Sequence, residues 1–271
     1  MEKINLSELK CIGGIIGDIV GKPYEFHPTK DVGFIYMKMA ERFTDDSLMT
    51  VANMDWLVND RDLSESMRDW GGRYKVGFGP SFRAWLSNPG MGAYNSFGNG
   101  SGMRVSPVGW WCDTLEDTLS LAEESAIVTH NHPEGVKGAK CIAGCIWMAR
   151  NGKTKDEIKS FCSSLGYDMD RKLSDIRPTY KFEVSCQKSV PESVLCFLEG
   201  GSYEDVIRLA ISLGGDADTQ ACMAGSIAEA FGYEIPDRFL GRLYRCADDM
   251  LEMIVKFNEK LREKENGTVG N

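Results

Sequence analysis

The sequence predicts an all-α protein that folds as one compact multi-helix bundle. Apolar residues recur at steps of three and four along most of the chain, which is the spacing of a buried helix face. Helix-capping pairs precede several of these apolar repeats. Strand patterns are scarce: only TYKFEV, residues 179–184, alternates as a strand does, and it follows Pro178 in a region that otherwise has the composition of a loop.

The expected helices follow in order. The first is expected over residues 7–21, ending just before Pro23. Capping pairs predict three further helix starts, at Thr114 with Asp117, Thr154 with Glu157, and Ser202 with Asp205. The last long helix is expected over residues 237–263, where leucine, methionine, isoleucine and phenylalanine mark one continuous apolar face.

Small residues line several of the expected helix faces. They include Gly13 and Gly17 in one helix, and Ala221, Gly225 and Ala228 in another. Small side chains at this spacing let two helix axes approach closely, which favours a compact bundle over an elongated solenoid. No internal repeat or linker divides the chain, so we expect a single domain over residues 1–265 and a short polar C-terminal tail over residues 266–271.

The composition excludes some functions. The chain of 271 residues has a formal net charge of -9, which argues against general nucleic-acid binding and suits a protein that holds divalent cations. Its nine cysteines form no CxxC pairs and fall within apolar helical patterns, as reduced core thiols do. We find no signal-peptide pattern and no run long enough to span a membrane. We therefore expect a cytoplasmic, monomeric protein without membrane contacts.

Two stretches place carboxylates and a threonine at the start of an apolar helix. They are Thr44, Asp45 and Asp46 in TDDS, and Asp216, Asp218 and Thr219 in GGDADT. Taken alone, each stretch is equally well explained by helix capping. Together they offer the hard oxygen ligands that magnesium or calcium prefers, without the histidine or cysteine ligands of a zinc site. Two such helix starts facing each other would make a site for one or two divalent cations.

Two further acidic residues belong to GGIIGDIVGKPYEF. Asp18 lies late in the apolar helix, and we expect it to be a buried, hydrogen-bonded structural carboxylate. Glu25 follows the break at Pro23, where a turn would let it reach into a cleft as an acid, a base or an outer metal ligand.

A glycine-rich stretch, residues 95–111, has the composition of a phosphate-binding loop. Gly98, Gly100 and Gly102 expose backbone amides that suit a phosphate, although plain turns have the same composition. Arg104 would add charge or brace the loop, and the spacing is neither a Walker motif nor a dinucleotide fingerprint. His130 ends a later helix, where it is either a polar cap or a substrate contact.

Together these stretches resemble the ADP-ribosylglycohydrolase family, from about Leu9 to Tyr233 and in the family's order. The opening pattern G-x-x-x-G-D-x-x-G-x-P-x-E matches residues 13–25, and T-D-D-[ST]-x-M-T matches residues 44–50. G-N-G-x-x-M-R matches residues 98–104, T-H matches residues 129–130, and G-G-D-x-D-T matches residues 214–219. Ala217 replaces the family's usual threonine, and Ser47 stands where threonine is common; neither change removes a ligand.

The resemblance implies an all-α fold with two magnesium ions in a central cleft, and we expect manganese to substitute for them. Thr44, Asp45 and Asp46 would serve one ion, Asp216 and Thr219 the other, with Asp218 bridging and Glu25 beside them. The implied substrate-binding residues are Ser96, Phe97, Gly98, Asn99, Gly100, Ser101, Gly102, Met103 and His130. The loop would hold the diphosphate of ADP-ribose, and His130 would contact the nearer ribose.

The implied activity is hydrolysis of the bond between ribose C1 and a protein side chain or small acceptor, through an oxocarbenium-like transition state. Glu25 is the first candidate to manage the proton, and Asp45 the second. Two alternatives remain: a catalytically inactive member that binds ADP-ribose or serves a structural role, and a different magnesium-dependent hydrolase such as a phosphohydrolase. The sequence does not identify the acceptor, which could be arginine, serine, another side chain, a nucleic-acid end or a metabolite.

Overall fold

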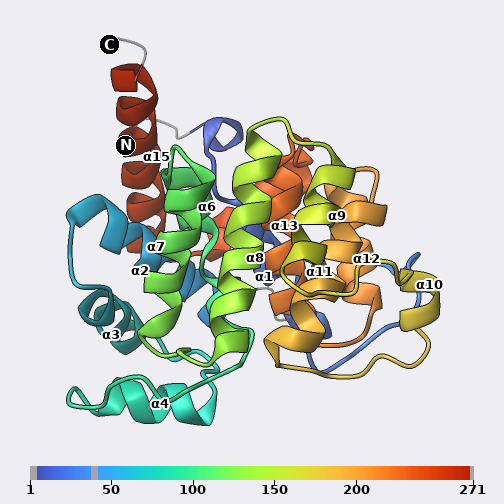
Figure 1. The fold of residues 1–271 in the computed structure, drawn as a ribbon, viewed down its shortest axis with the longest axis horizontal. Coiled ribbons are helices and arrows are strands. Elements are labelled where there is room, and N and C mark those ends of the chain that lie inside the picture. The colour runs from blue at the N-terminus through green and yellow to red at the C-terminus, as the bar shows by residue number, and fades with distance from the viewer. Residues whose placement is uncertain (1–4, 38–41, 269–271) are drawn as a thin grey trace.

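The computed structural model describes residues 5–37 and 42–268, and within them the regular elements are all helices (Figure 1). The expected all-α fold is therefore confirmed. The alternating segment 179–184 begins in a turn and contains no strand, in agreement with the loop-like composition noted for this region; next to it, a single bridge pairs Ser185 with Gly98. Alternation describes only one chain, whereas a strand needs a partner along its length.

Nine helices form the body of the bundle in the described chain. They are α1 (Gly13–Gly21), α2 (Asp45–Asn59), α6 (Ser106–Trp111), α7 (Leu115–Ile127), α8 (Pro133–Arg150), α11 (Cys186–Glu199), α12 (Tyr203–Ser212), α13 (Ala217–Ala230) and α15 (Asp248–Thr268). The others are α3 (Leu63–Arg73), α4 (Pro80–Ser87), α5 (Gly100–Met103), α9 (Lys155–Ser164), α10 (Leu173–Ile176), α14 (Asp237–Leu240) and the 3-10 turns η1 (Leu6–Glu8), η2 (Lys22–Tyr24) and η3 (Gly241–Arg245).

Helices α1 and α13 cross at the centre of the bundle with their backbones in contact (Figure 1). A Cβ atom on Gly17 would lie 2.2 Å from the carbonyl oxygen of Ala221, and one on Gly13 would lie 2.6 Å from that of Gly225. The close approach expected from the small residues is confirmed. The crossing brings the C-terminal part of α1 beside the start of α13, although the two helices lie near opposite ends of the sequence.

Two helix boundaries differ from expectation. The first helix begins at Gly13 rather than at residue 7, because the backbone is extended at Leu9 and Cys11 has a positive φ of 63°, neither of which is helical. The helix expected over residues 237–263 is broken into α14, η3 and α15, with Cys246 extended before α15. The apolar face continues through this break, since Phe239, Leu243 and Met250 are all buried. Periodicity alone therefore could not reveal it.

Other expectations about the helices and the cysteines are confirmed. Thr114, Thr154 and Ser202 each accept a hydrogen bond from the amide three residues on, as predicted from their capping pairs. All nine cysteines are buried and free of disulfides. A search of the described helices finds none that combines the length and the apolar character needed to cross a membrane.

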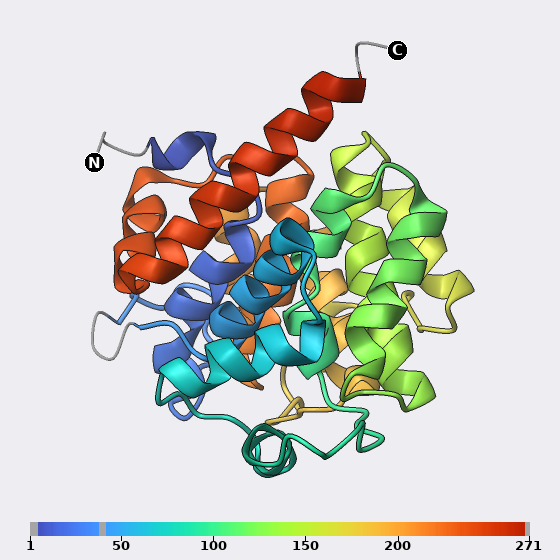
Figure 2. The ribbon, with the colours of Figure 1, turned by 90° about the vertical axis from the view of Figure 1, so that its left-hand side faces the viewer.

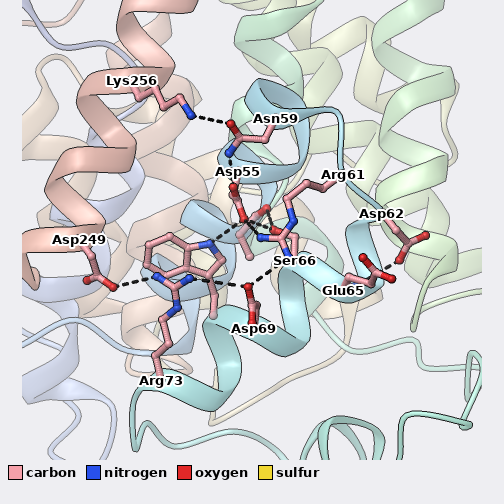
Figure 3. Close-up of polar contacts among 12 residues, drawn as sticks. Asp55, Asn59, Arg61, Asp62, Glu65, Ser66, Asp69, Arg73, Asp249 and Lys256 are labelled. Carbon is pink, nitrogen blue, oxygen red and sulfur yellow. Dashed lines mark hydrogen bonds and ion pairs between the residues drawn. The ribbon is translucent and has the colours of Figure 1, made fainter.

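A polar network around Asp55 joins the end of α2 to α3 and α15 (Figure 3). The buried Asp55 carboxylate accepts hydrogen bonds from Ser66 Oγ at 2.9 Å, Trp70 Nε1 at 3.1 Å and Arg61 at 2.9 Å. Asn59 also donates to it, and in turn accepts a hydrogen bond from a lysine of α15. Figure 2 shows α15 crossing the outside of the bundle, so this network helps to fix it there.

We expect Asp55→Ala to lower the free energy of unfolding by about 3 kcal/mol at pH 7, because it leaves buried donors without their acceptor. Burial alone would raise the pKa of Asp55, but the hydrogen bonds from Asn59, Ser66 and Trp70 lower it below the ordinary value. The stabilisation is therefore complete above the unfolded pKa and is lost as the pH falls through the folded one. Urea unfolding at pH 7 and in acid measures both effects.

Asp69→Ala is the matched control, since it also removes a carboxylate that pairs with Arg61. The Asp69 side chain is 52% exposed, so its loss is expected to cost less than about 1 kcal/mol. Equal losses in the two variants would contradict the role given to the buried network.

Candidate functional site

A cleft of about 430 Å³ opens where α2 and α13 begin. Its acidic floor is formed by the first residues of these helices and by Glu25, which follows η2. Residues 77–82, which include the start of α4, form one wall, and several residues between 94 and 104 form another. Aromatic and aliphatic side chains line the rest of the cleft, so carboxylates, a glycine-containing loop and apolar surface meet in one space.

The GGDADT turn directs two carboxylates towards this floor. Gly214 has a positive φ of 63°, and a Cβ on Gly215 would lie 2.4 Å from Tyr180 Cε1, so both positions need glycine. Asp216 occupies the N-cap position of α13, but its side chain makes no capping hydrogen bond. It accepts instead from Asn99 Nδ2 at 2.8 Å. Helix capping therefore does not explain this aspartate.

The TDDS turn is held by Asp18 of α1. The Asp18 carboxylate accepts from the amide of Thr44 at 2.9 Å, from its hydroxyl at 2.7 Å, and from the amide and hydroxyl of Ser47. The structural role expected for Asp18 is thus confirmed. Thr44 also caps α2 by accepting from the amide of Asp46. Because α1 is locked against α13, Asp18 places the start of α2 beside the start of α13.

The carboxylates gather into two groups that share one member. Asp18, Asp46 and Asp218 bring one oxygen each within 4.8 Å of one another, and so do Glu25, Asp216 and Asp218. One oxygen of Asp46, Oδ1, is buried and has no hydrogen-bond partner among the described residues. A buried, unpartnered carboxylate oxygen is costly unless a cation compensates it.

The pKa values of the aspartates in the floor also indicate repulsion between buried carboxylates. Burial raises the pKa of Asp46 and Asp218 well above the ordinary aspartate value, and neighbouring carboxylates raise each pKa further. Burial, followed by the charge of Asp18, raises the pKa of Asp45 to about 7. Carboxylates supply only oxygen ligands, and their negative charge here exceeds what the surrounding residues neutralise. Such a cluster fits one or two divalent cations of the magnesium or manganese type, so the residues present suit the metal centre expected from the sequence.

Within the part of the chain that the structure describes, one cation pairs with this acidic floor. Lys22 Nζ pairs with Glu25 and lies 3.8 Å from Asp218 Oδ2. Burial alone would lower the pKa of Lys22, but the hydrogen bond to Glu25 and the surrounding carboxylates raise it. No role was expected for Lys22 from the sequence, where it stands three residues before Glu25 and beside the proline of the turn.

The opposite wall carries the glycine-containing loop. The amide of Gly98 donates to Ser96 Oγ at 3.1 Å, and the amide of Asn99 donates to the carbonyl of Val184 at 2.7 Å. With its side chain bonded to Asp216, Asn99 ties the loop to the start of α13. The loop and the acidic floor are therefore joined directly by a buried hydrogen bond.

His130 presents a hydrogen-bond donor at the same wall. The hydroxyl of Thr129 accepts from Arg104 at 3.0 Å and lies 2.7 Å from His130 Nδ1. Since this hydroxyl has one proton, the arrangement that satisfies all three groups donates it to Nδ1 and leaves a proton on Nε2. Burial lowers the pKa of His130 well below its usual value, so the ring is neutral. Nε2 is also the atom nearest to a Cβ built on Gly100, at 3.0 Å.

Arg104 is a buried cation in the cleft wall. It braces the loop region by donating to Ser125 O at 2.7 Å and to Thr129, and no carboxylate of the described residues pairs with it. Its Nε has no hydrogen-bond partner there. This wall therefore carries positive charge opposite the acidic floor.

A family model for ADP-ribosylglycohydrolase matches residues 10–267. The chain belongs to the ADP-ribosylglycohydrolase family. It is similar to human ADP-ribosylhydrolase ARH3, at 25% identity over 82% of this chain and 84% of the relative. It is also similar to the uncharacterised protein YegU of Escherichia coli, at 28% identity over 80% of this chain and 85% of the relative. A solved ADP-ribosylglycohydrolase-related protein complex shares the fold with a TM-score of 0.71 and 22% identity, covering 96% of this chain and 99% of that one.

The structure brings most of the residues expected from the ADP-ribosylglycohydrolase motifs to the cleft. Those that line it are Glu25, Asp45, Asp46, Ser96, Gly98, Asn99, Gly100, Met103, His130, Asp216, Asp218 and Thr219. Of the rest, Thr44 is buried behind the floor, and Ser101 donates its hydroxyl to Gly135 O. Gly102 packs against Met223, and Phe97 is half exposed with its ring against His132.

Several residues that line the cleft lie outside the ADP-ribosylglycohydrolase pattern quoted from the sequence. They are Gly77, Phe78, Gly79, Pro80, Ser81, Phe82, Tyr94, Phe182 and Val184. The aromatic residues within the glycine-rich region from 75 to 109 were a partial signal, since a long, structured loop often carries function. Phe182 and Val184 come from the alternating segment over residues 179–184, and alternation gave no hint of their position.

Proposed function

We propose that this member of the ADP-ribosylglycohydrolase family is a magnesium-dependent hydrolase. It would cleave the glycosidic bond between ADP-ribose and a modified protein side chain or small acceptor. The observation that supports this proposal best is the pair of carboxylate groups that share Asp218 in the floor of the cleft. The similarity to ADP-ribosylhydrolase ARH3 from several vertebrates supports the same activity.

Asp46, Asp216, Asp218, Glu25 and Thr219 would hold the ions, together with Thr44 and Asp45. Magnesium bound there would supply the positive charge that orients ribose hydroxyls and makes a water molecule more acidic. The remaining work belongs to the chain's own residues. Asp18 keeps the start of α2 in place through its hydrogen bonds to Thr44 and Ser47.

The opposite wall suits the anionic half of the substrate. The loop over residues 96–102 would bind the diphosphate, with Met103 beside it, because glycine leaves its backbone accessible to phosphate oxygens. Arg104 adds positive charge, and the Nε2 proton of His130 would donate to a ribose oxygen. Fixing the diphosphate at a loop that Asn99 joins to Asp216 would hold ribose C1 at a constant place above the acidic floor.

Two carboxylates can handle the proton. Glu25 lines the cleft and belongs to the same carboxylate group as Asp216 and Asp218. It is the first candidate to protonate the leaving group or to accept a proton from water. Asp45 is the second candidate: it lies outside both carboxylate groups and also lines the cleft. Either residue would act on an oxocarbenium-like transition state.

Removal of metal is expected to stop the reaction. With EDTA present, release of ADP-ribose should fall by more than about a hundredfold, because the transition-state charge loses its main stabilisation. Magnesium or manganese in excess of the chelator should restore it. The measurement is chromatographic detection of ADP-ribose released from a panel of ADP-ribosylated arginine, serine and nucleic-acid substrates.

An EDTA-insensitive rate would contradict the metal dependence. If the panel yields no release while ADP-ribose binds, the protein is a reader of ADP-ribose instead of a hydrolase. A protein that releases phosphate from such substrates would support the alternative of a phosphohydrolase.

A further inference from the structure

The ammonium group of Lys22 lies among the carboxylates of the acidic floor. It pairs with Glu25 and lies 3.8 Å from Asp218, so it contacts the second carboxylate group at the member that both groups share. The side chain of Lys22 is only 18% exposed, and that of Glu25 is 16% exposed. This pair is therefore shielded from solvent far more than an ordinary surface ion pair, and salt screens it less.

Lys22 offsets part of the negative charge of the carboxylates in the floor. Asp18, Glu25, Asp46, Asp216 and Asp218 contribute carboxylates to the two groups. Among the ion pairs of the described residues, those that involve one of these five carboxylates all have Lys22 as the cation. Without a metal ion, its positive charge is thus the nearest compensation for carboxylates that repel one another.

A divalent cation and this ammonium group compete for the same oxygens. A metal ion bound by Glu25 and Asp218 would stand within a few ångströms of Nζ, where two like charges repel strongly. The lysine stem is flexible and has an alternative place at hand. In the present conformation its Nζ already lies 5.3 Å from the centre of the Phe26 ring, and Phe26 is 69% exposed, so the ammonium group can turn further towards this ring and solvent.

We propose that Lys22 is an internal counter-ion, which neutralises Glu25 and Asp218 in the metal-free protein and which a divalent cation displaces when it binds. This inference rests on the metal site of the proposed function. Lys22 thereby sets the affinity of the second carboxylate group for metal and keeps the metal-free fold stable. Its displacement also moves Glu25 from the ion pair with Lys22 to the metal site, so the surroundings of this candidate for proton transfer change when metal binds.

The test is the binding of manganese alone, without substrate. Lys22→Met keeps the length of the side chain and removes the charge. It is expected to lower the Kd for Mn²⁺ by about tenfold or more, as followed by the free-ion signal in electron paramagnetic resonance, and to lower the melting temperature in EDTA. Structural damage would weaken manganese binding, so tighter binding is a readout that only the counter-ion role predicts.

Two controls complete the experiment. Lys137→Met breaks a lysine–glutamate pair of the same spacing and similar exposure, with Glu134 at the start of α8, and should leave manganese affinity unchanged. Lys22→Arg keeps the charge, should behave as the wild type does, and serves if the methionine variant does not fold. Unchanged or weaker manganese binding in Lys22→Met would overturn the inference alone. A wild type and a variant that both fail to bind manganese would overturn the proposed metal dependence as well.

Discussion

Asp218→Asn is expected to reduce release of ADP-ribose by at least about a thousandfold, which corresponds to roughly 4 kcal/mol of transition-state stabilisation. Asp218 is the one carboxylate that belongs to both groups in the floor, so its loss affects every ion proposed to bind there. Asparagine has nearly the same size and stays in the first turn of α13, so the change removes charge and little else. The assay is ADP-ribose release with saturating magnesium.

The same substitution should stabilise the metal-free protein. Burial, and then the charges of Asp216 and Asp46, raise the pKa of Asp218, so its ionised form destabilises the fold at neutral pH. A higher melting temperature in EDTA, together with lost turnover, would separate a functional defect from unfolding. Asp205→Asn removes a carboxylate from the first turn of α12, away from the cleft, and should leave turnover unchanged. Full turnover in Asp218→Asn would refute the metal assignment.

Gly17→Val is expected to lower the free energy of unfolding by more than about 4 kcal/mol, or to prevent folding. The first carbon of the new side chain would meet the Ala221 carbonyl oxygen at 2.2 Å and its carbon at 2.6 Å. Both are backbone atoms of α13, which cannot turn aside as a flexible side chain does. The measurement is urea unfolding followed by circular dichroism.

Gly72→Ala provides the control for this prediction. Gly72 lies within α3, and no heavy atom comes within 4 Å of the place where its Cβ would stand. Alanine should therefore stabilise the protein by about 0.5–1 kcal/mol through its higher helix propensity. A mild effect of Gly17→Val, comparable in size to that of Gly72→Ala, would contradict the backbone contact between α1 and α13.

The sequence was sufficient for the helical class, the capped helix starts and the crossing of small-residue faces. Each of these depends on local chemistry: an N-cap threonine needs only the amide three residues on, and a glycine stripe is visible wherever it occurs. The sequence was insufficient where two different structures produce the same residue pattern. The apolar face over residues 237–263 continues through a broken helix, and the alternation over residues 179–184 belongs to a segment that forms no strand.

In the candidate site, too, the sequence revealed some residues and missed others. Motifs containing Asp46, Asp216 and Asp218 could be recognised because carboxylates beside small apolar residues are unusual. Lys22 was not recognised, because a lysine near a proline turn is unremarkable until its ammonium is found among carboxylates. Phe182 reaches the cleft through long-range contacts, which no local pattern records.

The contact between α1 and α13 also governs the order in which the molecule can be assembled. The amide of Ile12 donates to Glu229, 217 residues further along the chain, and Tyr203 donates to the carbonyl of Gly13, 190 residues away. During synthesis α1 leaves the ribosome long before its packing partner α13 does. Closing so long a loop is slow, so the nascent chain must carry an unpaired, apolar α1 until α13 has been made. The acidic cleft therefore cannot form before α13 is present, and a chain truncated before α13 would lack both the partner of α1 and the site.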